Sequence, residues 1–319
     1  MRSQEEWSRS ELVRKDRSAY PKDAFEGFPV SRQFDLVIAL AMMWLSQLAY
    51  ETDDEGKVDS ILSDWKLTKL GFKSNDPGTG LPPHSACVVV AEGHGATFVT
   101  FAGSDPLKFQ DWITDFSAMP SPNHLHSGFE AAVETVLPDI QKALGKRAAP
   151  NQPVFFTGHS LGGALAILAA WRISRLKNTP EIVVYTFGSP RNGGQEFFDD
   201  YTPRLGDFTF RLVHGTDIVP TVPPALLDGY RHVGQAVQCP TGGRFAGVAP
   251  MARNRNKPNL IESAIQAGIV DATAFATLQL IPTIPLQLDI RKKLQELLVA
   301  FLPRIIRDHV PDSYFRALT

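Results

Sequence analysis

Short β-prone runs alternate with helix-like stretches along most of the chain. The runs expected as strands are residues 86–91, 96–101, 154–156, 182–187, 208–213 and 230–239. Apolar residues with helical spacing cover residues 31–50, 58–67 and 128–144, and helix formers broken only by two glycines cover residues 161–171. The first two runs predict a hairpin, and the later alternation of strands and helices predicts parallel pairing. We therefore expect an α/β fold with a mostly parallel central sheet flanked by helices.

Two end segments differ from this alternation, within what we interpret as a single domain over residues 1–319. Residues 1–30 are charged and predict a surface arm, after which Ser31 is a candidate N-cap for the next helix. Residues 260–308 hold two apolar-rich helical stretches separated by prolines, a helical insertion near the C-terminus. We favour a helical hairpin packed on the domain, and the alternative is a cap over the active site or a lipid-facing surface.

Composition narrows the function classes. Hydrophobic residues make up 43% of the 319 positions and charged residues 21%, which is typical of a globular protein with a large core. The net charge of -2, without a basic cluster, argues against nucleic acid as a partner. The sequence starts without an apolar leader and contains no long apolar run, so we expect no transmembrane segment and a cytoplasmic or peripheral membrane location.

Cys87 and Cys239 are the only cysteines in the sequence. Neither has a neighbour at metal-binding spacing, so no metal site is predicted. Without a secretion signal we expect free thiols rather than a disulfide.

The stretch from Pro153 to Trp171 carries the strongest chemical signal. An apolar run is followed by G-x-S-x-G at residues 158–162 and then by a series of helix formers. Strand, sharp turn and helix around a serine predict a nucleophile elbow with Ser160 as the nucleophile. With the alternating pattern, this points to an α/β-hydrolase-like architecture.

A serine nucleophile needs a base and an orienting acid, and in α/β-hydrolases both follow it in the order acid, then base. Asp217 comes directly after an expected strand and is the preferred acid, because Asp207 precedes that strand. For the base, only His232 and His309 follow Asp217. His309 is favoured because His232 falls inside the run 230–239, where a strand would hold it in the sheet.

Stabilising the oxyanion of an acyl transfer requires two N–H donors near the serine. One is the backbone N–H of Leu161, the residue after the nucleophile. The second is expected from a loop after an earlier strand, where Gly103-Ser104 is the best fit. We assign this role to Ser104, and the alternative is that these two residues form an ordinary turn.

Several motifs, all in order, resemble those of the class 3 lipases, the fungal-type triacylglycerol lipases within the α/β-hydrolases. They are VTFAGS at 99–104, WITD at 112–115, HSGF at 126–129, GHSLGG at 158–163, FGSPR at 187–191, DIVP at 217–220 and DHVPDSY at 308–314. The last motif is similar to the ending of bacterial members and supports His309 as the base. The chain departs from the family at Ala102, where an arginine is usual.

The resemblance implies a short amphipathic lid after the oxyanion residue. That lid would span residues 105–116, with Leu107, Phe109, Trp112 and Ile113 as its apolar face. The helices of residues 260–308 would then form a second cover.

These observations predict a serine carboxylester hydrolase that cleaves lipid esters, most simply acylglycerols, through an acyl-enzyme and without a metal or organic cofactor. The expected partners are the lipid ester and, transiently, a lipid interface. The alternatives are a phospholipase A1, a short-chain esterase, or an inactive lipid-binding scaffold that uses the same fold. The sequence does not indicate the oligomeric state.

Overall fold

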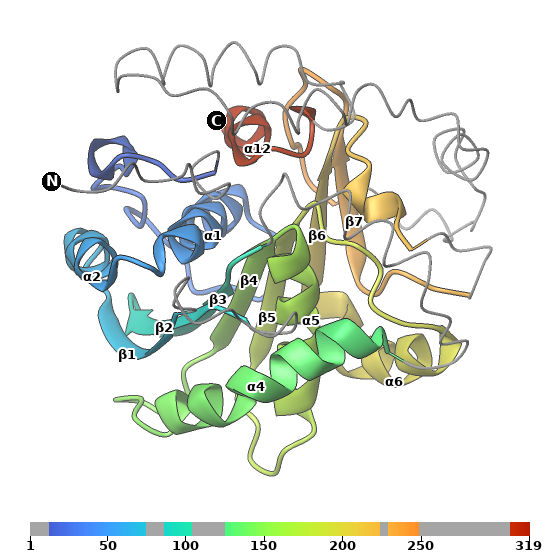
Figure 1. Ribbon diagram of the computed structural model, residues 1–319, viewed down its shortest axis with the longest axis horizontal. Coiled ribbons are helices and arrows are strands. Elements are labelled where there is room, and N and C mark those ends of the chain that lie inside the picture. Colours follow the sequence, from blue (N-terminus) through green and yellow to red (C-terminus); the bar gives the residue numbers. More distant parts are fainter. Residues whose placement is uncertain (1–12, 75–85, 104–124, 224–228, 249–306) are drawn as a thin grey trace, which may run out of the picture.

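The described part of the protein is built around one seven-stranded sheet (Figure 1). The computed structural model describes residues 13–74, 86–103, 125–223, 229–248 and 307–319. The strands are β1 Thr68–Lys73, β2 Val88–Gly93, β3 Ala96–Phe101, β4 Val154–His159, β5 Ile182–Phe187, β6 Thr209–His214 and β7 Gln235–Cys239. Strands β1 to β3 pair antiparallel, and β3 to β7 pair parallel. The predicted mostly parallel sheet is confirmed.

The strand order follows the chain from β1 to β7 without reversing. The α-helices in the described residues are α1 Leu36–Leu48, α2 Glu55–Asp64, α4 Ser127–Leu144, α5 Leu161–Ser174, α6 Gln195–Leu205 and α12 Pro311–Leu318. When successive right-handed crossovers advance in the same direction along a sheet, their helices lie on the same face of it. Helices α4, α5 and α6 accordingly lie on one face of this sheet (Figure 1). The other face is covered by α1, which precedes the sheet, and by α12, which follows it.

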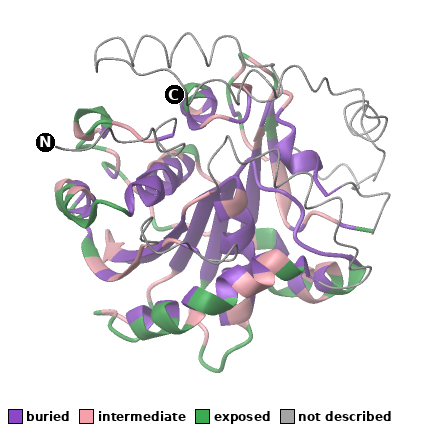
Figure 2. Cartoon of the chain, in the orientation of Figure 1, coloured by how far each residue is buried: buried purple, intermediate pink, exposed green. Residues whose placement is uncertain are grey.

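The core lies on both faces of the sheet, and its central strands are buried on each side (Figure 2). In β4, Phe156 packs toward α4 and α5, whereas Phe155 packs toward α1. All six residues of β4 and of β5 are buried. Burial on both faces explains why these strands read as continuous apolar runs rather than as an alternation.

Three predicted boundaries shift for local reasons. Helix α1 starts at Leu36 rather than after Ser31, because the Asp35 carboxylate accepts hydrogen bonds from the backbone N–H groups of Val37 and Ile38 at 2.7 and 3.2 Å. Helix α2 ends at Asp64, and the chain then forms β1, an edge strand that the sequence pattern did not predict. Strand β7 begins only at Gln235, after Gly234 with its φ of +72°.

The arm expected on the surface contributes to the core in its described part. Tyr20 and Phe25 are buried, with ring centroids 6.1 and 5.6 Å from Trp65. The indole N–H of Trp65 donates to the carbonyl of Pro21 at 2.7 Å. The predicted helical stretches between residues 260 and 306 lie outside the described residues.

Candidate active site

Ser160 occupies a strained turn between β4 and α5. Its φ of +59° is a conformation that costs a non-glycine residue about 1–3 kcal/mol. The neighbouring glycines make this turn possible. A Cβ atom at Gly158 would lie 2.2 Å from the carbonyl carbon and oxygen of Gly162, and one at Gly162 would lie 2.4 Å from the carbonyl oxygen of Phe101. The G-x-S-x-G spacing therefore lets strand and helix approach around the serine.

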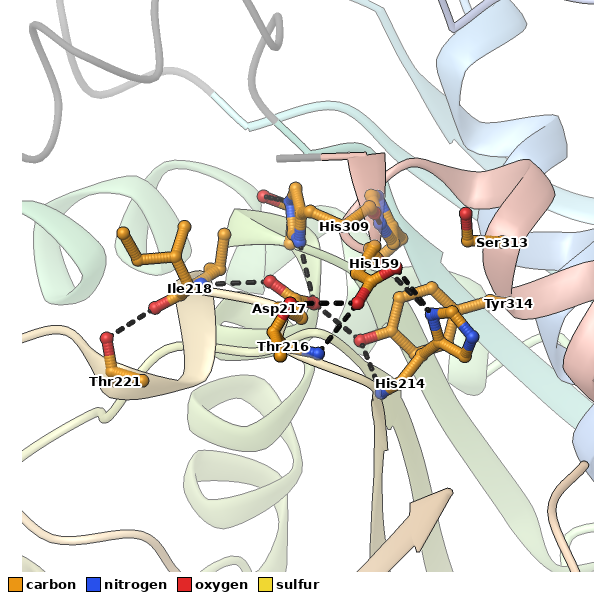
Figure 3. Close-up of polar contacts among 12 residues, drawn as sticks. His159, His214, Thr216, Asp217, Ile218, Thr221, His309, Ser313 and Tyr314 are labelled. Carbon is orange, nitrogen blue, oxygen red and sulfur yellow. Dashed lines mark hydrogen bonds and ion pairs between the residues drawn. The ribbon is translucent and has the colours of Figure 1, made fainter. Parts of the chain in front are cut away.

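Ser160, His309 and Asp217 form a hydrogen-bonded relay (Figure 3 shows the acid and the base). Ser160 Oγ lies 2.9 Å from His309 Nε2, and His309 Nδ1 lies 2.9 Å from Asp217 Oδ2. All three residues are buried. The serine and the acid follow the C-terminal ends of β4 and β6, and the base precedes α12. Such a relay can take the hydroxyl proton of a serine as it attacks a carbonyl group.

The acid of this relay is held by two further donors. The backbone N–H of Val219 donates to Asp217 Oδ1 at 2.9 Å, and the Tyr314 hydroxyl donates to Oδ2 at 2.5 Å. Burial and the Asp217 carboxylate raise the pKa of Tyr314, so the phenol keeps its proton. Sequence reasoning did not assign a role to Tyr314, although it lies within the DHVPDSY motif.

A second histidine, His159, contacts the base through the main chain and the ring of His309. His159 Nε2 lies 2.7 Å from the carbonyl oxygen of His309, and His159 Nδ1 lies 2.8 Å from the Tyr50 hydroxyl. A carbonyl only accepts, so Nε2 carries the proton and Nδ1 accepts from Tyr50. Burial, together with the nearby His309, lowers the pKa of His159 well below its ordinary value. The ring therefore stays neutral while it stacks on His309, with 4.6 Å between centroids.

His232, the alternative base, lies outside β7 and is hydrogen-bonded elsewhere. Its Nε2 lies 2.7 Å from the carbonyl oxygen of Pro220, within the loop that follows the acid. Burial and the charges of Arg211 and Arg191 lower the pKa of His232 well below its ordinary value. The structure thus brings His309, and not His232, to the serine.

The predicted oxyanion donors are only partly within the described residues. Leu161 is the first residue of α5, so its backbone N–H has no acceptor within the helix. Ser104 and the lid residues Leu107, Phe109, Trp112 and Ile113, with the whole of 105–116, lie outside the described residues. Gly103 borders the site, because a Cβ atom there would lie 2.2 Å from the Tyr50 hydroxyl and 2.7 Å from the carbonyl oxygen of His159.

The chain is similar to known proteins over part of its length. Residues 98–227 match the family model "Lipase (class 3)". "Lipase ZK262.3" of Caenorhabditis elegans is 38% identical over 63% of this chain and 59% of its own length. "Secreted mono- and diacylglycerol lipase 1" of Fusarium solani is 37% identical over 40% of this chain and 39% of its own length. "Secreted mono- and diacylglycerol lipase LIP1" of Malassezia globosa is 35% identical over 47% of this chain and 51% of its own length. The chain spans about half the length of these relatives.

A solved structure of the Rhizomucor miehei lipase propeptide complex shares the fold, with a TM-score of 0.55 and 21% identity over 72% of this chain and 77% of that one. The parallel sheet with a serine on its strand–turn–helix elbow defines an α/β-hydrolase. Within that class, residues 98–227 are similar to the class 3 lipases.

The expected cytoplasmic or peripheral membrane location is contradicted, because the Fusarium and Malassezia relatives are named as secreted enzymes. That expectation rested on how the given sequence starts, which is not evidence about where the protein works. In the described part of the chain, no helix is both long and apolar enough to cross a bilayer.

Proposed function

We propose that this protein is a serine carboxylester hydrolase that cleaves acylglycerols. The observation that carries the proposal is the unbroken relay from Ser160 Oγ through His309 to Asp217, with both separations at 2.9 Å. The names of the Fusarium and Malassezia relatives support acylglycerols as substrates.

In the proposed reaction, Ser160 Oγ attacks the ester carbonyl while His309 Nε2 accepts its proton. Asp217 stabilises the resulting imidazolium through the Nδ1–H bond. The Leu161 N–H, with Ser104 as the second donor, stabilises the oxyanion. His309 then gives the proton to the departing glycerol oxygen, which leaves an acyl group on Ser160. Water, deprotonated by His309, attacks this acyl-enzyme, the bond to Ser160 Oγ breaks, and His309 returns the proton to Oγ as the fatty acid leaves.

For access of substrate to the serine, the resemblance in sequence supports a lid at residues 105–116, with Leu107, Phe109, Trp112 and Ile113 as its apolar face. These residues lie outside the part of the chain that the structure describes. Burying each large side chain in lipid would stabilise the open state by about 1.5–3 kcal/mol, the ordinary value for apolar burial. The protein then contacts the lipid interface transiently during turnover.

The test compares the wild type with Ser160→Ala on emulsified mono-, di- and triacylglycerols, on phospholipid and on p-nitrophenyl butyrate. We expect the highest kcat/KM on an acylglycerol and a loss of roughly 10⁶-fold in kcat in the variant, as when a triad acts as a unit. Equal hydrolysis by Ser160→Ala would refute the mechanism. A preference for phospholipid or for the butyrate would keep the mechanism and replace the substrate.

A further inference from the structure

A second buried carboxylate, Asp308, lies directly before the base in the chain and is not part of the relay. Its Oδ2 accepts three hydrogen bonds, from Thr216 N at 2.7 Å, from Thr216 Oγ1 at 3.0 Å and from Thr241 Oγ1 at 2.6 Å. Only 2% of Asp308 is exposed. Asp308 directly precedes the base, and Thr216 directly precedes the acid. The hydrogen bonds between Asp308 and Thr216 therefore join the two positions next to the base and the acid.

The turn that carries the acid is shaped around this carboxylate. Gly215 has a φ of +54°, and a Cβ atom there would lie 2.2 Å from both Asp308 Oδ2 and Thr241 Oγ1. The backbone N–H of Gly215 donates to the carbonyl of Cys239 at 2.8 Å, which fixes the turn to the end of β7. No side chain larger than hydrogen fits between the turn and the carboxylate.

His214 holds the same residue from the other side of the turn. Its Nδ1 lies 3.3 Å from the Asp308 carbonyl oxygen and 3.7 Å from Asp308 Oδ1. His214 and Thr216 lie beside Asp217 and His309 in Figure 3. Asp308 is thus held through its main chain and its side chain by residues 214–216, which lead directly into the acid.

The charge state of Asp308 suits these contacts. Burial by itself would raise the pKa of this carboxyl, but hydrogen bonds from Thr216 and Thr241 and the nearby His214 hold it below its usual range. An ionised carboxylate only accepts, and the three groups at Oδ2 only need to donate. An asparagine would keep an oxygen at the Oδ2 position but would remove the negative charge that strengthens these three hydrogen bonds, and its NH₂ group would take the Oδ1 position, 3.7 Å from His214 Nδ1.

We propose that Asp308 is a positioning residue for the ester hydrolysis, one that sets the distance between base and acid by tying the peptide before His309 to the peptide before Asp217. This inference rests on the proposed function. Because each peptide unit is planar and rigid, the Asp308–Thr216 contact and the His309–Asp217 contact act as two parallel bridges between the same two segments. Releasing the first bridge frees the second to lengthen.

The test uses Asp308→Asn, with Asp312→Asn as the matched control. Asp312 is in the same segment, and its side chain is 62% exposed. Steady-state kinetics on the preferred ester are measured well below the unfolding temperature of each variant. We expect Asp308→Asn to lower kcat about 100-fold, as for a misplacement near 1 Å, with KM within about threefold of the wild type. Asp312→Asn should retain the wild-type values.

A spectroscopic readout separates positioning from mere stability. The His309 Nδ1–H proton, bound to Asp217, should give a far-downfield proton resonance in the wild type that Asp308→Asn shifts or loses. If Asp308→Asn does not fold, the pair Thr241→Val and Thr241→Ser replaces it. Valine should lower kcat about tenfold, for loss of one hydrogen bond to a charged group, and serine should restore it.

The outcomes distinguish the two proposals. An active Ser160→Ala refutes the proposed function, whatever Asp308 does. An active wild type whose Asp308→Asn variant is folded, keeps kcat within threefold and keeps the downfield resonance refutes the positioning role alone.

Discussion

Gly188 provides a sharp test of the geometry at the acid and the base. It directly follows β5, has a φ of +59°, and its N–H donates to the carbonyl of Leu212 at 3.0 Å. A Cβ atom built there would lie 2.6 Å from Asp217 Oδ2 and 2.8 Å from His309 Nδ1. Gly188→Ala would therefore place a methyl group against the hydrogen bond that joins acid and base.

The size of the effect follows from these distances. Ordinary contact begins at 3.4 Å, so Cβ and Oδ2 must separate by about 0.8 Å. Displacements of this order in a catalytic group reduce turnover by about 10²-fold, and complete loss of the acid's function by about 10⁴-fold. We expect a fall in kcat between these values. The left-handed φ also costs alanine about 1–2 kcal/mol of stability.

Gly27→Ala separates the two effects. Gly27 has a φ of +67° and nothing within 4 Å of its Cβ position, so the variant carries the backbone penalty alone. The assay is the rate of Ser160 labelling by a fluorescent phosphonate together with kcat on the preferred ester, each beside a thermal melt. Gly188→Ala should lose both activities and Gly27→Ala neither. A folded Gly188→Ala variant with wild-type labelling and turnover would refute the geometry of this acid–base contact.

Tyr314→Phe removes a hydrogen-bond donor to the acid, and a hydrogen bond to a charged group is worth about 1.5–3 kcal/mol. We therefore expect kcat/KM of the folded variant to fall about 10- to 150-fold. An unchanged kcat/KM would show that Tyr314 does not support the acid. Cys239 is buried, which raises the pKa of its thiol to about 11, whereas Cys87 is half-buried. A thiol reagent should therefore label Cys87 rapidly and Cys239 only on unfolding. The pKa values of His159 and His232 are lowered by burial, so below about pH 6.5 the unfolded chain binds protons that the folded chain does not. The free energy of unfolding should then decrease as the pH is lowered, by up to about 1.4 kcal/mol per pH unit for each histidine. In urea titrations between pH 7 and 5, His232→Asn should make this dependence on pH less steep.

The elements that sequence predicted best are those whose signal is local. Strand β5 was predicted with its observed bounds, because six apolar or β-prone residues are buried on both faces of the sheet. Ser160 was found from the strand–turn–helix pattern that its own neighbours create. Asp217 and His309 were chosen by chain order and by position after strands or between helices, and the structure brings their side chains to Ser160.

What sequence missed depends on contacts between distant segments. Tyr314 meets Asp217 across 97 residues, and Tyr50 meets His159 across 109 residues. Neither tyrosine has a neighbour in the sequence that reveals its partner. The edge strand β1 was missed because it is only partly buried and its apolar residues are few. The buried Tyr20 and Phe25 were missed because charged neighbours surround them in the sequence.

The place of α12 in the chain gives the protein a built-in order of assembly. The sheet from β1 to β7, the nucleophile and the acid are all synthesised before residue 240, whereas the base comes at residue 309. A nascent chain that has not reached residue 309 therefore lacks the histidine that lies beside Ser160. Under the proposed function, an unfinished chain cannot digest the lipids of the cell that makes it, because hydrolysis begins only when α12 docks beside α1 on the completed sheet.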